Sequence, residues 1–281
     1  MAAGLYIHEA NGSWPLFLSK PDVTMSYALI TGASKGIGKA IAEELARRNF
    51  NVLLVARSES LLQTLAQNLA DKYRIKADYL ALDLAGAQAP QQIFDWCRSR
   101  QYTIQVLVNN AGYGLSGSFE KYTVAENLDM MHVNMLVPVQ LTQLLLPQLR
   151  QQSRAYILNI ASSAAYQAVP LLSLYAATKA FMLTFSRGLR QELAGSAVSV
   201  TCVSPGSTDT DFVQRANIGE KGRKAAQKVN MTAEAVAAVS VESMLAGKAE
   251  VIPGLINKLG AFMVWLMPKG LVEKTAMQIY Q

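Results

Sequence analysis

The sequence predicts an α/β protein, with a single doubly wound domain built on a mainly parallel, seven-stranded sheet. Three observations lead to this prediction. Short β-branched or aliphatic runs alternate with longer helical patterns along most of the chain, as repeated strand–helix–strand units require. The composition is 51% hydrophobic and only 16% charged, which fits a buried sheet covered by helices. The length of 281 residues suits one large domain with a substantial core.

The expected elements follow this alternation in order. Each expected strand is a short aliphatic or β-branched run, at residues 27–31, 51–56, 77–82, 106–109, 156–160, 198–203 and 250–252. The longer patterns between them predict helices at residues 37–48, 59–73, 90–100, 124–151, 174–192 and 233–245. The fourth of these continues past Pro138. Ser58 and Thr232 stand where N-cap side chains are expected.

Composition and charge exclude several classes of function. The formal net charge is +6, but the lysines and arginines are scattered, so a nucleic-acid partner is not expected. Cys97 and Cys202 are the only cysteines, too few for a disulfide framework or a zinc site, so a reducing compartment and a metal-free mechanism are expected. The first residues lack the basic and continuous apolar regions of a secretory signal, and a cytoplasmic protein is expected.

The stretch ITGASKGIGKAIAEEL at residues 30–45 places three glycines between an apolar run and a helical pattern. A triphosphate-binding loop needs Gly, four residues and then Gly-Lys-Ser or Gly-Lys-Thr, because the hydroxyl binds Mg²⁺. Here Gly38 and Lys39 are followed by Ala40, and the position five before Gly38 is Ala33. The remaining interpretation is a strand–turn–helix junction whose N–H groups bind the pyrophosphate of a dinucleotide. A glycine-rich turn without a ligand is the alternative.

Five motifs in order make the chain resemble the short-chain dehydrogenase/reductase family. They are the Thr-Gly-x-x-x-Gly-x-Gly turn at residues 31–38, Asn109-Asn110-Ala111-Gly112 after the fourth strand, the helix residue Asn134, Ser162 followed by Tyr175 and Lys179 in a Tyr-x-x-x-Lys pair, and the Pro205-Gly206 turn. The resemblance implies a Rossmann-type catalytic domain over residues 25–253. It also implies an oxidoreductase that uses a nicotinamide dinucleotide.

Tyr175 and Lys179 lie four positions apart on a predicted helix, so their side chains share a face about 5–6 Å apart. An ammonium at that range favours the phenolate, which tunes the tyrosine for proton transfer. The resemblance implies that Ser162 donates a hydrogen bond to the substrate carbonyl, with Ser163 as an adjacent competitor. It also implies that Asn134 holds a water that links Lys179 to solvent.

The end of the second strand predicts NADP(H) rather than NAD(H). Enzymes that use NAD place an acid there for the adenosine ribose, whereas this chain has Ala56 followed by Arg57, which fits a 2′-phosphate. Lys35 in the glycine turn adds a second cation, while Glu59 remains an alternative ribose ligand. By resemblance, Asn109 contacts the backbone beside the adenine. Together with the resemblance, these patterns assign cofactor binding to Gly32, Ser34, Lys35, Gly36, Ile37, Gly38, Arg57, Asp83, Asn110, Ala111, Gly112, Tyr175, Lys179, Pro205, Gly206, Thr208 and Thr210.

The expected activity is hydride transfer between NADP(H) and a carbonyl or secondary alcohol. The residues expected to line the substrate pocket favour an apolar ketone, aldehyde or 3-oxoacyl-type substrate, and they are Tyr166, Val169, Leu171, Leu172 and Phe212. A catalytically idle NADP(H)-binding sensor or scaffold on the same fold is the alternative. Members of the family are commonly dimers or tetramers, so the resemblance implies a homo-oligomer.

Two terminal segments stand outside the alternation. Residues 1–24 are expected to be an N-terminal extension of uncertain role, and residues 254–281 an apolar helical segment packed on the same domain. Apolar residues recur at helical spacing in the second segment, beside Trp265 and three lysines. It could belong to the core or a subunit interface, cover the pocket, or touch a membrane surface, and we expect it to border the active-site mouth. Its apolar run is too short to span a bilayer, so no stable insertion is expected.

Overall fold

The computed structural model describes residues 26–209, 216, 219–220, 222 and 230–280. Seven strands form one sheet in the order β3-β2-β1-β4-β5-β6-β7, and every neighbouring pair is parallel. The strands are β1 (Ser26–Thr31), β2 (Asn51–Ala56), β3 (Ala77–Ala81), β4 (Thr103–Asn109), β5 (Ala155–Ile160), β6 (Val198–Val203) and β7 (Glu250–Val251). This topology confirms the predicted doubly wound α/β fold.

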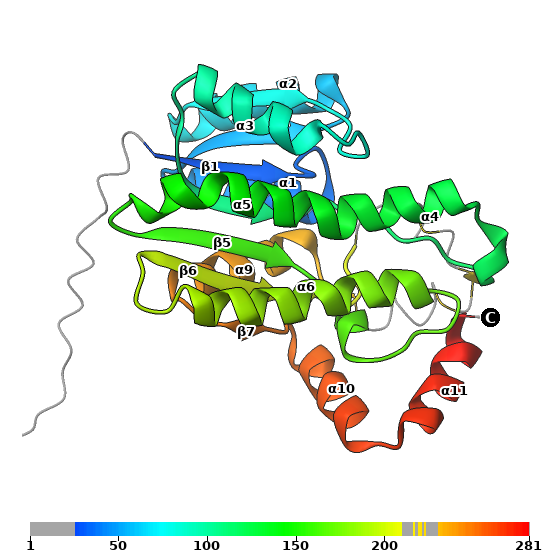
Figure 1. Ribbon diagram of the computed structural model, residues 1–281. Coiled ribbons are helices and arrows are strands. Elements are labelled where there is room, and N and C mark those ends of the chain that lie inside the picture. The colour runs from blue at the N-terminus through cyan, green and yellow to red at the C-terminus, as the bar shows by residue number, and fades with distance from the viewer. Residues whose placement is uncertain (1–25, 210–215, 217–218, 221, 223–229, 281) are drawn as a thin grey trace, which may run out of the picture.

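Helices cover both faces of the sheet, as Figure 1 shows. The helices on one face are α1 (Gly36–Arg47), α2 (Glu59–Tyr73) and α9 (Ala233–Leu245), and those on the other are α3 (Ala89–Ser99), α5 (Val137–Arg150) and α6 (Ser173–Glu192). Two separate apolar clusters result, one on each side of the sheet. Because both faces are buried, the strands read as nearly continuous apolar runs.

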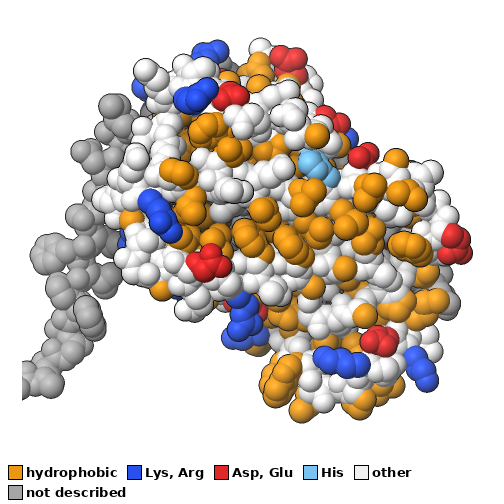
Figure 2. Space-filling view, viewed as in Figure 1, with side chains coloured by type: hydrophobic (Ala, Val, Ile, Leu, Met, Phe, Trp, Pro, Cys, Tyr) orange, Lys and Arg blue, Asp and Glu red, His pale blue; other side chains and the backbone are white. Residues whose placement is uncertain are grey.

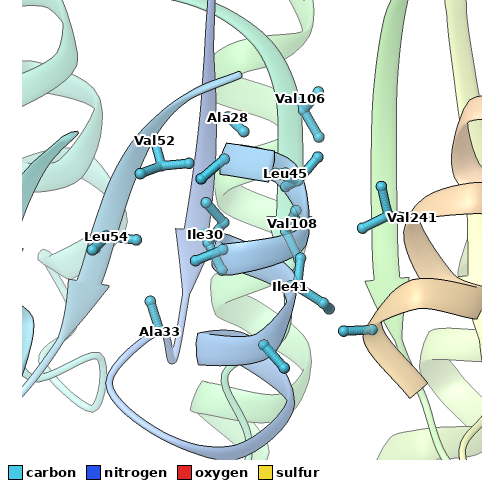
Figure 3. Close-up of a cluster of buried hydrophobic side chains, with 14 of the residues drawn as sticks. Ala28, Ile30, Ala33, Ile41, Leu45, Val52, Leu54, Val106, Val108 and Val241 are labelled. Atoms are coloured by element: carbon cyan, nitrogen blue, oxygen red, sulfur yellow. The ribbon is translucent and has the colours of Figure 1, made fainter. Parts of the chain in front are cut away.

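Alternation along each strand divides its side chains between the two clusters. In β1, Ala28 and Ile30 pack in the cluster beneath α1, whereas Leu29 packs in the opposite one. In β2, Leu54 joins Ile30, and Leu53 faces the other way. Figure 3 shows the first cluster, in which side chains of three neighbouring strands meet those of α1 and α9. Because successive side chains of a strand point to opposite faces, the position of a residue in its strand decides which layer of helices it packs against.

The strand order reverses between β1 and β4. From β1 the chain builds outward through β2 and β3 to one edge, and from β4 it builds through β5, β6 and β7 to the other. The connections that leave the carboxyl ends of β1 and β4 therefore run to opposite sides. In open α/β sheets this divergence leaves a crevice in which ligands bind.

The long predicted helix at residues 124–151 is interrupted in the structure. It consists of α4 (Val124–Met131), a π-helical turn (His132–Leu136) and α5. Such π turns are rare and are found mostly at functional sites. No local feature of the sequence predicted the changed hydrogen-bond spacing.

Both predicted N-cap positions are confirmed, but only one of the two side chains forms a cap hydrogen bond. Ser58 occupies the N-cap position of α2, but its side chain accepts no cap hydrogen bond and instead lines the cleft described below. Thr232 caps α9 as predicted, because its hydroxyl accepts from the Ala235 N–H at 3.1 Å. At the start of α4, Thr123 and Glu126 form a reciprocal capping box that the sequence analysis missed.

The C-terminal segment forms a hairpin of two helices, α10 (Leu255–Leu266) and α11 (Lys269–Tyr280), which projects from the domain beside β7 (Figure 1). No residue of α10 is buried, so this helix does not belong to the core. In α11, Val272 and Ala276 are buried. Among the residues that the structure describes, no helix is both long and apolar enough to cross a bilayer.

Adjacent leucines on α2 provide a matched test of the core. Leu62 is fully buried, whereas its neighbour Leu61 is 39% exposed. Leu62→Ala should lower the free energy of unfolding by about 2–5 kcal/mol, because it leaves a cavity among packed side chains. Leu61→Ala should cost less than about 1 kcal/mol. Urea unfolding followed by circular dichroism measures both, and equal losses would contradict the assigned packing.

Candidate active site

A cleft of about 980 Å³ opens at the carboxyl edge of the sheet, at the upper end of the size range of ligand pockets. Its walls come from the turns that follow the strands, from α6, and from the C-terminal hairpin. Most predicted site residues line it, namely Gly32, Ser34, Lys35, Gly36, Ile37, Gly38, Arg57, Asp83, Asn110, Ala111, Gly112, Ser162, Tyr175, Lys179, Pro205, Gly206 and Thr208. Thr210 and Phe212 lie outside the described residues.

At two positions of the glycine turn, Gly32 and Gly38, the packing leaves no room for a side chain. Gly32 has a φ of +66°, which favours glycine. A Cβ added to Gly38 would lie 2.3 Å from the carbonyl oxygen of Gly32 and 2.4 Å from Nδ2 of Asn110. The Asn110 amide in turn donates to the carbonyls of Thr31 and Gly32, at 2.9 and 3.2 Å. The turn is thus a rigid cradle over the N-terminus of α1.

The cradle favours anions. The first turn of α1 carries no acidic residue, so the positive end of the helix dipole is not offset there. Lys35 at its N-cap and Arg57 after β2 are exposed residues of the cleft wall. Both cations add positive charge to the cleft wall near the glycine turn.

Lys179 is almost fully buried, at 5% exposure, and its ammonium donates to the carbonyl of Ile160 at the end of β5 (3.0 Å). Burial lowers its pKa to about 8. Its Nζ lies 5.8 Å from the centre of the Tyr175 ring, in agreement with the spacing expected along one helix face. A lysine tuned in this way is still mostly protonated at neutral pH.

Ser162 follows β5 and caps the short helical turn η4 (Ser163–Tyr166). Its Oγ accepts from the Ala164 N–H at 3.1 Å, which fixes the hydroxyl while leaving its own proton free to donate elsewhere. Ser163 also lines the cleft. The capping bond holds Ser162 in one orientation, which a carbonyl ligand requires.

Asn134 lies behind the cleft wall rather than on it. It is buried in the π turn, where Oδ1 accepts from the Tyr113 N–H (3.1 Å) and Nδ2 donates to the Tyr113 carbonyl (2.9 Å) and to Thr178 Oγ1 (3.0 Å). Both amide protons are therefore used within the protein, and only an acceptor position remains for water. The side chain joins the loop after β4 to α6.

The resemblance implied that Asn109 contacts the cofactor backbone beside the adenine, but the structure places its side chain elsewhere. Its side chain is buried in the sheet and donates to Asn159 (2.8 Å) and Thr142 (3.3 Å), so it does not reach the cleft. Asn159 then donates to Ser186 on α6 (2.8 Å). This chain of polar groups links β4, β5 and the helix that carries Tyr175 and Lys179.

Comparison with known proteins identifies the family. The sequence profile of the short chain dehydrogenase family matches residues 26–221. The chain belongs to this family. A solved short-chain dehydrogenase from Sphingobium yanoikuyae in complex with NADPH is 30% identical, with a TM-score of 0.75, and the match covers 86% of this chain and 95% of that one.

Two curated relatives are reductases or dehydrogenases by name. Very-long-chain 3-oxoacyl-CoA reductase-A of Danio rerio is 36% identical over 183 residues, which are 64% of this chain and 57% of that protein. Hydroxysteroid dehydrogenase-like protein 1 of Gallus gallus is 30% identical over 213 residues, 74% of this chain and 64% of that protein. The chain thus spans less than two thirds of the length of these relatives.

The cleft wall also contains residues that the sequence analysis did not single out. Tyr113 lines the wall directly after the Asn-Asn-Ala-Gly motif. Asn257 of α10 also lines it, so close to Gly206 that a Cβ there would lie 2.2 Å from Asn257 Oδ1. Asn257 was visible in principle, as an amide in a helical pattern that is mainly apolar.

The lowered pKa of Lys179 predicts a pH-dependent stability. Between about pH 8 and the ordinary lysine value near 10.5, the unfolded chain binds a proton that the folded protein has released. Stability should therefore rise with pH through this window, by up to about 1.4 kcal/mol per pH unit from this group. Urea unfolding without cofactor, compared with Lys179→Met, isolates the effect. A variant whose stability rises just as steeply would show that Lys179 does not titrate there.

Proposed function

We propose that the protein is an NADP(H)-dependent oxidoreductase that passes hydride between the nicotinamide and a carbonyl or secondary alcohol. One observation carries the proposal: Tyr175, Lys179 and Ser162 line the same cleft as the glycine cradle and Arg57. A proton donor, a hydrogen-bond donor and an anion site thus share one space. The preferred substrate is an apolar ketone, aldehyde or 3-oxoacyl-type compound.

The residues present fit a phosphorylated dinucleotide. The glycine cradle would hold the pyrophosphate against the N-terminus of α1. Gly32 and Gly38 keep the turn in this shape, because a Cβ at either position would clash with Asn110. Arg57 and Lys35 would contact a 2′-phosphate, and no acid occupies the strand end at Ala56. The NADPH complex of the Sphingobium yanoikuyae relative supports this choice.

The proposed chemistry divides hydride and proton between two sources. When bound, NADPH supplies the hydride. Ser162 donates a hydrogen bond to the substrate oxygen, and Tyr175 transfers its phenolic proton to that oxygen as negative charge develops there. The Lys179 ammonium stabilises the resulting phenolate. Asn134 positions the loop after β4 and helix α6 around these groups, through its bonds to Tyr113 and Thr178.

An apolar substrate is favoured by the walls of the cleft beyond these polar groups. The large apolar side chains on the wall are Val169, Leu172, Met263, Val264, Met267, Val272 and Ile279. The names of the relatives from Danio rerio and Gallus gallus refer to very-long-chain 3-oxoacyl-CoA and hydroxysteroid compounds. Both classes contain a large apolar part, an acyl chain or a steroid skeleton.

We also propose a homo-oligomer in the cytoplasm. Val124, Leu128 and Leu136 give the α4 and π-turn region an exposed apolar surface of the kind that subunit interfaces use. Both cysteines are buried and unpaired, which suits a reducing compartment. Light scattering of the purified protein measures its mass in solution.

A spectrophotometric assay tests the activity directly. Oxidation of NADPH and NADH is followed with ketones and aldehydes of increasing chain length. We expect turnover with NADPH and a kcat/KM that increases with chain length. Tight NADPH binding without turnover on any carbonyl compound would indicate an idle cofactor-binding protein and contradict the proposal.

Arg57→Ala should narrow the preference for NADPH over NADH by about tenfold or more, because a charge-assisted contact to phosphate is worth roughly 1.5–3 kcal/mol. Arg100→Ala is the matched control, since Arg100 is an exposed arginine that precedes β4 and does not line the cleft. It should leave the preference unchanged. Dissociation constants for NADPH and NADH, measured by cofactor fluorescence, give the comparison. If the wild type bound both cofactors equally well, the proposed preference for NADPH would be wrong.

Tyr175→Phe should lower kcat by at least about 100-fold, because it removes the proton donor. NADPH should still bind, since the ring and helix are kept. Tyr113→Phe removes another phenol from the cleft wall and should retain most of the turnover. Steady-state kinetics and cofactor titration separate the two effects. Near-normal turnover in Tyr175→Phe would refute the proposed role.

A further inference from the structure

Helix α10 presents its apolar side chains to solvent instead of to the protein. We define its outer face as the exposed large residues Leu255, Ile256, Leu259, Phe262, Met263, Trp265 and Leu266. The less exposed positions are Asn257, Ala261 and Val264. At about 100° per residue these three share one narrow side, so the outward face is more apolar than the inward one. A surface helix of a globular protein normally shows the opposite arrangement.

The outer face is continuous and large. Leu255 is 82% exposed and Trp265 73%, and the rings of Phe262 and Trp265 lie 6.0 Å apart. Figure 2 shows hydrophobic side chains on the projecting lobe formed by α10 and α11. Contiguous apolar patches of this kind on soluble proteins mark sites of interaction.

The charge of the hairpin is mainly positive. Residues 251–280 contain Lys258, Lys269 and Lys274, and their one acidic residue is Glu273. An apolar face with a tryptophan and flanking lysines is the pattern of helices that lie in the interface of an anionic bilayer. The twelve residues of α10 rise about 18 Å, short of the roughly 30 Å hydrocarbon core, so such a helix lies on the membrane and does not cross it.

A second copy of the chain fits the outer face less well. Two-fold pairing through α10 would bring the same patch of each copy together. The net positive charge of each hairpin, three lysines against the single acid Glu273, would then face the same charge on the other copy. An anionic lipid surface supplies the opposite charge and the apolar layer at once.

The inner side of the same hairpin lines the cleft. Val264, Met267 and Val272 belong to the cleft wall. Met263 belongs to both surfaces, because it is exposed on the outer face and also lines the cleft. Apolar surface therefore runs from the outside of α10 into the space that holds Tyr175.

We propose that the outer face of α10 docks on an anionic lipid bilayer, and that apolar carbonyl substrates pass from the acyl-chain layer into the cleft beside Met263. The docking is independent of catalysis. The route of the substrate rests on the proposed function.

Vesicle flotation of the full-length protein tests the docking without turnover. Vesicles of phosphatidylcholine with phosphatidylserine should carry the protein upward in a density gradient, and vesicles of phosphatidylcholine alone should carry less of it. Phe262→Ser with Trp265→Ser should lower the partition coefficient by about tenfold or more. Leu61→Ser is the control, because Leu61 is an exposed leucine on α2, at the opposite end of the sheet. Lys258→Glu with Lys269→Glu should abolish the preference for phosphatidylserine.

Flotation that is absent, or unchanged in the Phe262→Ser, Trp265→Ser protein, would overturn the docking. So would a wild-type oligomer that this double variant dissociates without any binding to vesicles, since a second copy would then occupy the face. Circular dichroism establishes that the variant is folded.

Activity tests the route separately. Neither Phe262 nor Trp265 lines the cleft, so the double variant should reduce a small water-soluble ketone as the wild type does. Its turnover of a long-chain ketone embedded in vesicles should fall by about tenfold, in step with partitioning. Equal turnover of the embedded ketone by both proteins would overturn the route. A wild type that floats but reduces no ketone would leave the docking supported and overturn the proposed function.

Discussion

The hydrogen bonds from the Asn110 amide to the carbonyls of Thr31 and Gly32 join the carboxyl ends of β1 and β4, and the cleft depends on this junction. Thr31 reinforces it, because its hydroxyl accepts from the N–H groups of Asn110 and Ala111. Gly38 must lack a side chain for α1 to begin over the same point. The end of β1, the loop after β4 and the start of α1 therefore form one rigid unit.

A second set of polar contacts extends this rigidity to the other half of the cleft. Asn109, Asn159 and Ser186 connect β4 through β5 to α6. Asn134 connects α6, through Thr178, back to the loop after β4. The Lys179 ammonium ties the same helix to the end of β5. The helix that carries the proposed proton donor is thus held from three directions, and a buried polar network of this kind fixes orientation better than apolar packing does.

The sequence predicted the strands and the residues of the cleft well because both carry local signals. A buried parallel strand needs a run of apolar residues, and a turn as tight as that at Gly32 and Gly38 admits only glycine. Arg57 was identifiable because the end of β2 faces the crevice in any sheet with this order.

The errors arose where tertiary contacts decide the role of a side chain. Asn109 and Asn110 are identical residues side by side, yet one points into the sheet and the other caps the glycine turn. The contacts of Asn134 with Tyr113 and Thr178 were also not predictable, because these residues come together only in the folded chain. The outward orientation of α10 was equally hidden, because periodicity gives the apolar face of a helix but not the direction in which it points.

The junction at Asn110 also constrains the order in which parts of the chain can fold. Thr31 and Asn110 are 79 residues apart, and no hairpin shortens the path between them because every strand pairing is parallel. Closing so long a loop is entropically costly and kinetically slow. A nascent chain that has emerged only as far as β3 carries all three glycines but has nothing to hold them in shape. The glycine cradle therefore cannot take its final shape before the loop after β4 packs against the end of β1.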